Sequence, residues 1–149
     1  MNLSPTTRLG AVHRFPVRVY YEDTDAGGIV YHAQYLCFAE RARTELLREA
    51  GADHQSLLAQ HGGVFAVRRA VVDFRRAARL DDALVVESRV ERCGGARLAL
   101  RQEINRAGEA IVLIEVELAF ISLDLRPRRL PSPLIAGFDK MDLLPSTDA

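Results

Sequence analysis

One stretch organises this chain: Tyr20-Tyr21-Glu22-Asp23-Thr24-Asp25-Ala26-Gly27-Gly28-Ile29-Val30-Tyr31-His32. It joins an alternating, strand-like run to a helical pattern, and it sets two aspartates beside a Gly-Gly pair. Glycine lets the backbone approach a ligand closely, and the first turn of a helix offers unpaired N–H groups at the positive end of its dipole. This combination can stabilise an oxyanion next to a carboxylate that acts as a base or a nucleophile.

Length and composition predict an ordinary globular protein of one domain. The 149 residues are enough for a sizeable core, and 48% of them are hydrophobic. The formal net charge is zero, which argues against a general binder of nucleic acid or anionic membranes. No apolar run approaches the roughly 20 residues of a membrane span, and residues 1–14 lack the apolar segment of a signal peptide. We therefore expect a cytoplasmic protein.

Hydrophobic periodicity predicts an α+β domain. The expected elements are a strand over 14–22, a helix over 33–50, a short helix over 53–61, strands over 64–78, 83–93, 97–106 and 110–123, and a short C-terminal helix with Ser132 as N-cap. One long helix followed by a run of strands suits a helix that covers one face of an antiparallel sheet. We expect a flexible N-terminus over 1–13, one domain over 14–142 and a tail over 143–149.

The same stretch carries a family resemblance. Residues 20–36, continued by Phe38-Ala39-Glu40-Arg41-Ala42-Arg43-Thr44-Glu45, closely resemble the hotdog-fold acyl-CoA thioesterases. The resemblance is specifically to the branch that contains 4-hydroxybenzoyl-CoA thioesterase and the thioesterases associated with the Tol-Pal system, the YbgC type. The order of the elements and the run Arg129-Leu130-Pro131 extend it over most of the chain.

This resemblance implies a fold, an assembly and an activity. The implied hotdog fold wraps an antiparallel sheet of about five strands around one long helix. The implied assembly is a homodimer that pairs two sheets edge to edge, or a homotetramer, with active sites at the dimer interface. The implied activity is hydrolysis of a short-chain or aromatic acyl thioester on coenzyme A, or on the arm of an acyl-carrier protein. No metal or cofactor is implied, because coenzyme A is part of the substrate.

The resemblance also assigns the site. The family's essential carboxylate is the second aspartate of the Asp-x-Asp loop, which is Asp25 here. Asp25 either attacks the thioester carbonyl as a nucleophile or activates a water as a general base, and the sequence does not separate these roles. The backbone N–H of His32 falls where the family places its oxyanion donor, while its imidazole either orients water or substrate or only caps the helix. The expected substrate-binding positions are Gly27, Gly28, Ile29, Val30 and Tyr31.

Other charged residues have less specific interpretations. Asp23 is expected to accept N–H bonds within the turn, and Glu40 is expected on a solvated helix face rather than in the site. Two arginine clusters either bind the phosphates of coenzyme A or an acidic carrier protein, or extend into solvent at strand ends: Arg75, Arg76 and Arg79, and Arg126, Arg128 and Arg129.

Two other classes of function stay open. A hotdog dehydratase or hydratase would use Asp25 and His32 as a carboxylate–histidine pair that moves a proton at carbon. A binding module would dock acyl-carrier protein with little turnover, although an intact Asp25 loop argues against lost activity. Cys37 and Cys93 have no partner at metal-ligand spacing, so we expect reduced structural thiols.

Overall fold

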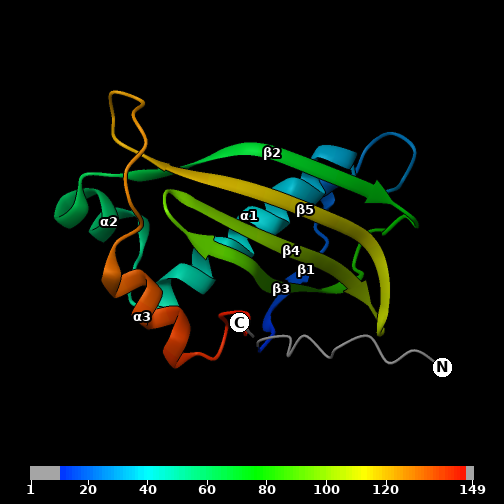
Figure 1. Ribbon diagram of the computed structural model, residues 1–149. Helices are drawn as coiled ribbons and strands as arrows, with labels where there is room; N and C mark the ends of the chain where they lie inside the picture. Colours follow the sequence, from blue (N-terminus) through cyan, green and yellow to red (C-terminus); the bar gives the residue numbers. More distant parts are fainter. Residues whose placement is uncertain (1–10, 147–149) are drawn as a thin grey trace.

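The structure, a computed structural model, describes residues 11–146 as a five-stranded sheet packed with helices. The elements in chain order are β1 (His13–Arg18), the 3₁₀ turn η1 (Tyr21–Asp23), α1 (His32–Glu49), α2 (His54–His61), β2 (Val64–Phe74), β3 (Ala83–Gly94), β4 (Arg97–Arg106), β5 (Glu109–Ile121) and α3 (Ser132–Lys140). The sheet order is β1-β3-β4-β5-β2, and every neighbouring pair is antiparallel (Figure 1).

Helix α1 lies against one face of the sheet and forms the centre of the core (Figure 1). Its buried side chains recur at helical spacing: Tyr35, Phe38, Ala39, Ala42, Leu46 and Leu47. They meet inward side chains of the strands, such as Leu98, Ile104 and Phe120, which are also buried. Each large apolar side chain buried in this way contributes roughly 1.5–3 kcal/mol. The sheet wraps the helix, so the α+β hotdog prediction is confirmed.

A polar cluster inside the core ties α1 to the middle strands. The buried side chain of Gln102 donates from Nε2 to the carbonyl of Ala39 at 2.9 Å and to Oγ of Ser88 at 3.0 Å. Its Oε1 accepts a hydrogen bond from Arg43 at 2.8 Å. Burial lowers the pKa of the Arg43 guanidinium, and the nearby Glu40 carboxylate opposes this shift. Both polar atoms of the buried amide are therefore paired.

Strand β2 forms one edge of the sheet and changes register at a β-bulge between Val67 and Arg69. The bulge adds one residue, so the inward side chains have odd numbers before it and even numbers after it. Phe65 and Val67 accordingly line a hollow against α1, and Phe74 at the end of the strand contacts His32 of α1. Without the bulge, Phe74 would point to the outer face of the sheet.

Three of the predicted strands end earlier than expected, and the last of them ends at Ile121 rather than at residue 123. The first ends at Arg18 rather than at residue 22, because the chain turns into η1, where the carboxylate of Asp23 accepts the N–H of Tyr20 at 2.8 Å. The strand predicted over 64–78 ends at Phe74. The next two N–H groups both donate to the carbonyl of Ile111, at 2.9 and 3.1 Å, so the chain leaves the ladder there.

The C-terminal segment also differs from its prediction. The N-cap of α3 is Pro131 rather than Ser132, because Pro131 keeps an extended conformation with ψ of 138° and the helix begins one residue later. The core continues past the predicted domain end at residue 142. Leu143 is buried, and its N–H donates to the carbonyl of Phe138 at 2.9 Å.

Parts of the terminal predictions lie outside the described residues. These are residues 1–10 of the N-terminus expected to be flexible and residues 147–149 of the expected tail. Within the described range, His13 already belongs to β1 and is buried. None of the helices between residues 11 and 146 combines the length and the apolarity that a bilayer crossing requires.

Candidate functional site

The Asp25 turn presents an exposed carboxylate. The N–H of Asp25 donates to the carbonyl of Ile29 at 2.9 Å, and the N–H of Gly28 donates back to the carbonyl of Asp25 at 3.0 Å. Gly28 has a φ of +77°, a left-handed conformation that favours glycine. Oδ1 of Asp25 accepts the N–H of Gly27 at 2.8 Å, and Oδ2 has no partner in the described part of the chain. The turn therefore orients the carboxylate and leaves one oxygen available.

Helix α1 begins at His32 with an open N–H donor. Its N-cap is Tyr31, whose N–H donates to the carbonyl of Asp23 at 2.9 Å. Within residues 11–146 the backbone N–H of His32 has no hydrogen-bond partner, and it lies at the positive end of the helix dipole. The exposed imidazole lies 4.6 Å from the ring of Tyr31 and 6.2 Å, edge-on, from that of Phe74. It makes no hydrogen bond to Asp25 in this structure.

Asp23 fixes the base of the turn. Its side chain is buried, and its two oxygens accept bonds from different elements. Oδ2 accepts the N–H of Tyr20 at 2.8 Å, and Oδ1 accepts Nε2 of Gln34 at 2.9 Å. The carboxylate thus joins η1 to the first turn of α1. The prediction that Asp23 accepts an N–H within the turn is confirmed.

The segment between β2 and β3, residues 75–82, pairs with the Asp25 turn and supports it. The N–H of Val30 donates to the carbonyl of Ala78 at 2.9 Å, and Ile29 forms an isolated β-bridge with Arg79. The N–H of Ala78 donates in turn to the hydroxyl oxygen of Tyr35 on α1 at 3.0 Å. The segment therefore connects the Asp25 turn to the buried face of the helix.

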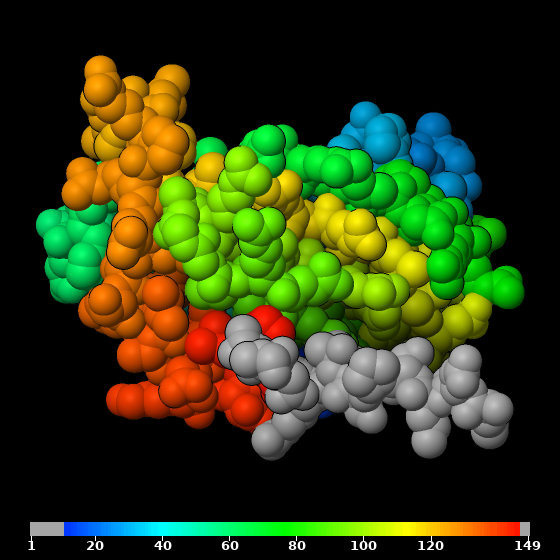
Figure 2. All heavy atoms as spheres, viewed as in Figure 1, coloured from blue at the N-terminus to red at the C-terminus, as the bar shows by residue number. Residues whose placement is uncertain are grey.

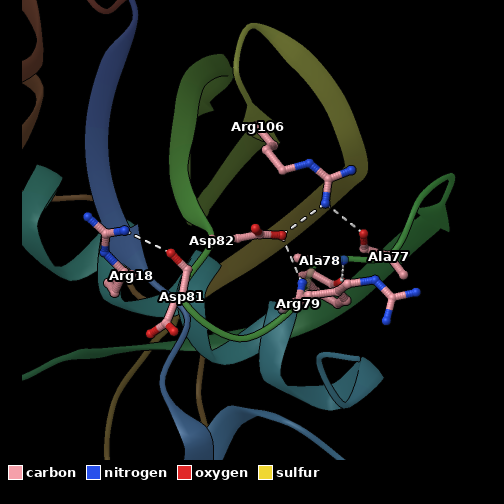
Figure 3. A network of polar contacts seen from close by, with 8 residues as sticks. Arg18, Ala77, Ala78, Arg79, Asp81, Asp82 and Arg106 are labelled. Carbon is pink, nitrogen blue, oxygen red and sulfur yellow. Dashed lines mark hydrogen bonds and ion pairs between the residues drawn. The ribbon is translucent and has the colours of Figure 1, made fainter. Parts of the chain in front are cut away.

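Charged side chains fix this supporting segment (Figure 3). Arg106 of β4 donates to the carbonyl of Ala77 at 2.8 Å and to the carboxylate of Asp82 at 3.0 Å. Asp82 also accepts the backbone N–H of Arg79 at 2.9 Å. The N–H of Arg79, together with the guanidinium of Arg106, lowers the pKa of Asp82. These bonds hold both ends of the segment that pairs with the loop.

A hollow of about 240 Å³ opens beside the start of α1. It is lined by Ile29, Val30, His32, Tyr35, Phe74, Arg75, Arg76 and Ala77. Of the predicted site residues, Ile29, Val30 and His32 line it. The other four belong to the adjoining turn or to the helix cap and are not among the lining residues: Asp25, Gly27, Gly28 and Tyr31. The structure thus brings part of the predicted site into one concave surface.

Sequence reasoning missed Tyr35 and Phe74 as site residues. Tyr35 comes three positions after His32, so helical spacing places it on the same side of α1 and could have found it. No spacing rule connects Phe74 to His32, because the bulge in β2 decides which way its ring points.

Two of the other charged candidates, Arg75 and Arg76, line the hollow. Arg75 pairs with Asp73 at 3.0 Å, and Arg76 pairs with Glu109, so both rim arginines have carboxylate partners. Glu40 is exposed on α1, as expected. Among the described residues, no three His, Cys, Asp or Glu side chains are arranged to hold a metal ion. The site therefore offers a carboxylate, an open N–H donor and a hollow with mainly apolar walls.

Sequence comparison relates the chain to known thioesterases. Residues 19–140 match the thioesterase-like superfamily. The acyl-CoA thioester hydrolase YbgC of Escherichia coli is 44% identical over 128 residues, which cover 84% of this chain and 94% of that protein. The acyl-CoA thioesterase YbgC of Haemophilus influenzae is 44% identical over 125 residues, which cover 83% of this chain and 92% of that protein.

Solved structures share the fold. A probable thioesterase from Bartonella henselae has a TM-score of 0.79 at 41% identity, over 81% of this chain and 100% of that chain. A 1,4-dihydroxy-2-naphthoyl-CoA thioesterase from Synechocystis has a TM-score of 0.81 over 89% of this chain and 98% of that chain, and at 22% identity it supports the fold alone. The family match begins just after β1, runs through α3 and includes the Asp25 turn. The chain therefore belongs to the thioesterase-like superfamily and is a thioester hydrolase with the hotdog fold.

Proposed function

We propose that the chain hydrolyses acyl-CoA thioesters at the Asp25 turn. The observation that carries the proposal is an exposed carboxylate on a turn that leads directly into a helix with an open first N–H. Relatives at 44% identity that are named acyl-CoA thioester hydrolases support the choice of substrate. An arrangement of this kind supplies both a group that attacks or activates and a donor that stabilises developing charge.

The backbone N–H of His32 is the proposed oxyanion donor. A thioester carbonyl oxygen that accepts this N–H gains negative charge as the tetrahedral intermediate forms, and the helix dipole favours that charge. Losing one such donor typically costs about 10²–10³ in rate. The imidazole of His32 lies over the same hollow and is the proposed group for orienting substrate or water.

Asp25 has two chemical routes to the same products. As a nucleophile, its free oxygen bonds to the carbonyl carbon, the C–S bond breaks, and the coenzyme A thiolate leaves and takes up a proton. Water then opens the mixed anhydride, which gives the free acid and restores the carboxylate. As a general base, Asp25 instead takes a proton from the water that attacks the carbonyl. The exposed turn has room for either route.

The open edge of β2 supports a homodimer. No strand of residues 11–146 pairs with its outer edge, and three large apolar side chains of the strand are about half exposed: Val67 at 55%, Val71 at 45% and Phe74 at 48%. Long exposed edges of this kind are templates for pairing with another chain. We propose antiparallel pairing of two β2 edges, which brings the hollow beside β2 to the dimer interface, with a homotetramer as a further step. Light scattering on the purified protein should give the mass of a dimer or tetramer, and a monomer would contradict this assembly.

The acyl group and its carrier are the finer points of the proposal. Short-chain and aromatic acyl groups both suit a hollow with apolar walls and two arginines at its rim. Coenzyme A is the proposed carrier, an acyl-carrier-protein arm is its alternative, and the cytoplasm, where such thioesters are made, is the proposed location.

The decisive experiment measures release of free thiol from a panel of short, long and aromatic acyl-CoAs. Wild type should hydrolyse at least one class, and Asp25→Asn should lower kcat by about 10²–10⁴. Asp139→Asn, at an exposed aspartate of α3, is the matched control and should leave the rate unchanged. Full activity of Asp25→Asn would contradict the site and direct attention to Glu40 and His32. Hydrolysis of acyl-carrier-protein thioesters alone would change the carrier, and no hydrolysis would favour the binding module.

A further inference from the structure

The hollow beside α1 has a charged rim and an apolar interior. Arg75 and Arg76 lie at the rim, where Asp73 and Glu109 neutralise them. The interior walls come from the side chains of Ile29, Val30, Tyr35 and Phe74 and from Ala77. A group that enters this interior leaves water without meeting an unpaired charge, so the walls favour an apolar group. The acyl part of a thioester has this character, whereas the nucleotide end of coenzyme A does not.

Phe74 forms the wall of this interior on the β2 side. It is the last residue of β2, and the bulge earlier in the strand turns its ring toward α1. The ring centroid lies 5.9 Å from that of Tyr35 and 6.2 Å, edge-on, from that of His32. Such edge-on and tilted aromatic contacts favour one ring orientation. The ring therefore packs against His32, the residue that carries the open N–H, and lines the hollow beside it.

The support behind Phe74 is rigid. Tyr35 is 3% exposed, and its hydroxyl oxygen accepts the N–H of Ala78, so its ring cannot swing away to enlarge the hollow. Ile29 and Val30 on the other side are fixed by backbone pairing with the segment 78–79. The side chain of Phe74 makes no hydrogen bond within residues 11–146, so its substitution changes the width of the interior without breaking one.

We propose that Phe74 sets the upper limit on the width of the acyl group next to the thioester. This inference rests on the proposed hydrolysis at Asp25 and adds the residue that selects among substrates. Unbranched acyl groups pass beside the ring, and groups that are bulky at the first carbons collide with it. In an apolar pocket one methylene changes the specificity ratio by roughly 10–200-fold, so removal of a whole ring should be readily measured.

The test compares kcat/KM for hexanoyl-CoA and cyclohexanecarbonyl-CoA in wild type, Phe74→Ala, Phe74→Leu and Phe74→Trp. The ratio of cyclohexanecarbonyl to hexanoyl turnover should rise about tenfold or more in Phe74→Ala, rise less in Phe74→Leu and fall in Phe74→Trp. A ratio taken within one variant cancels any loss of folded protein. Val71→Ala is the matched control, because this valine is exposed on the opposite face of the same strand and should leave the ratio unchanged.

The outcomes separate the two proposals. A ratio that stays constant across the Phe74 variants, while wild type hydrolyses both substrates, would overturn the assignment of Phe74 and leave the Asp25 proposal intact. An equal shift in Val71→Ala would also overturn it, because the effect would then come from the strand rather than from the ring. Wild type that hydrolyses neither substrate, nor any other acyl-CoA, would contradict the proposed function itself.

Discussion

The hydroxyl oxygen of Tyr35 accepts a hydrogen bond from the backbone N–H of Ala78 at 3.0 Å, away from solvent. Tyr35 belongs to the buried face of α1, and Ala78 belongs to the segment whose carbonyl accepts the N–H of Val30. One side chain therefore links the helix that begins at His32 to the backbone beside the Asp25 turn. The relative position of the carboxylate and the N–H donor depends on this link.

Replacing Tyr35 with Phe should destabilise the fold by about 1–3 kcal/mol, because the buried N–H of Ala78 loses its acceptor. Urea unfolding followed by circular dichroism measures the change. Tyr21→Phe is the matched control, since Tyr21 is 83% exposed and its substitution should alter stability by no more than about 0.5 kcal/mol. Equal stability of wild type and Tyr35→Phe would show that the bond is not needed.

The two aspartates of the loop should respond in opposite ways to substitution by Asn. Asp23→Asn removes a buried acceptor that holds Tyr20 and Gln34, and should cost about 1–3 kcal/mol of stability. Asp25→Asn affects one bond at an exposed turn, so its stability should change by less than about 1 kcal/mol while its activity falls. Thermal unfolding and thiol release on the same samples separate the two effects. If Asp25→Asn were strongly destabilised, its loss of activity would come from unfolding and would not support a catalytic role for Asp25.

Close packing of α3 against the end of α1 gives a third prediction. A Cβ at Gly137 would overlap the carbonyl oxygen of Ala50, so Gly137→Ala should destabilise by at least about 1–3 kcal/mol. Gly94→Ala is the control, because a Cβ there meets no other atom within 4 Å. Denaturant midpoints of the two variants should differ clearly. Similar midpoints would mean that α3 shifts at little cost.

Acid should lower the stability of the folded protein by protonating the carboxylate of Asp82, which lies in the segment between β2 and β3. Its pKa is lowered in the folded protein, first by the backbone N–H of Arg79 and also by Arg106, so the charged form is favoured by folding. This contribution is present above the unfolded pKa of about 4 and is lost as pH falls through the lower folded value. Stability measured between pH 6 and pH 3, roughly spanning that value, should fall less steeply in Asp82→Asn than in wild type. If stability changes with pH equally steeply in both proteins, Asp82 does not contribute to the loss of stability in acid.

No sequence pattern indicated the projecting loop that follows β5. Residues 122–127 stand out from the body of the protein (Figure 2). Ser122 closes this loop, with its N–H donating to the carbonyl of Arg126 at 2.8 Å, while Leu123 and Leu125 are largely exposed. The strand predicted to reach residue 123 ends at Ile121 because these local bonds replace the ladder.

The sequence alone determined the elements whose signal is local. Alternation along β3, β4 and β5 and helical spacing along α1 predicted these elements, because in each element the period of the backbone decides which side chains share a face. The Asp25 turn was readable for the same reason, since its glycines and carboxylates act on their own neighbours. The order of one helix and a run of strands then allowed few arrangements other than a helix under an antiparallel sheet.

Tertiary structure decided what depends on residues far apart in the chain. The bulge in β2 turned Phe74 inward, and only packing against α1 brought its ring to His32. The pairing of Ile29 and Val30 with residues 78 and 79 likewise joins two segments that are far apart in the chain, and the sequence of neither segment predicts this contact. Sequence periodicity indicates which face of an element is apolar, but it indicates neither a register shift nor the element that packs against that face. The carboxylate was therefore readable from the sequence, whereas the shape of the hollow beside it came from the fold.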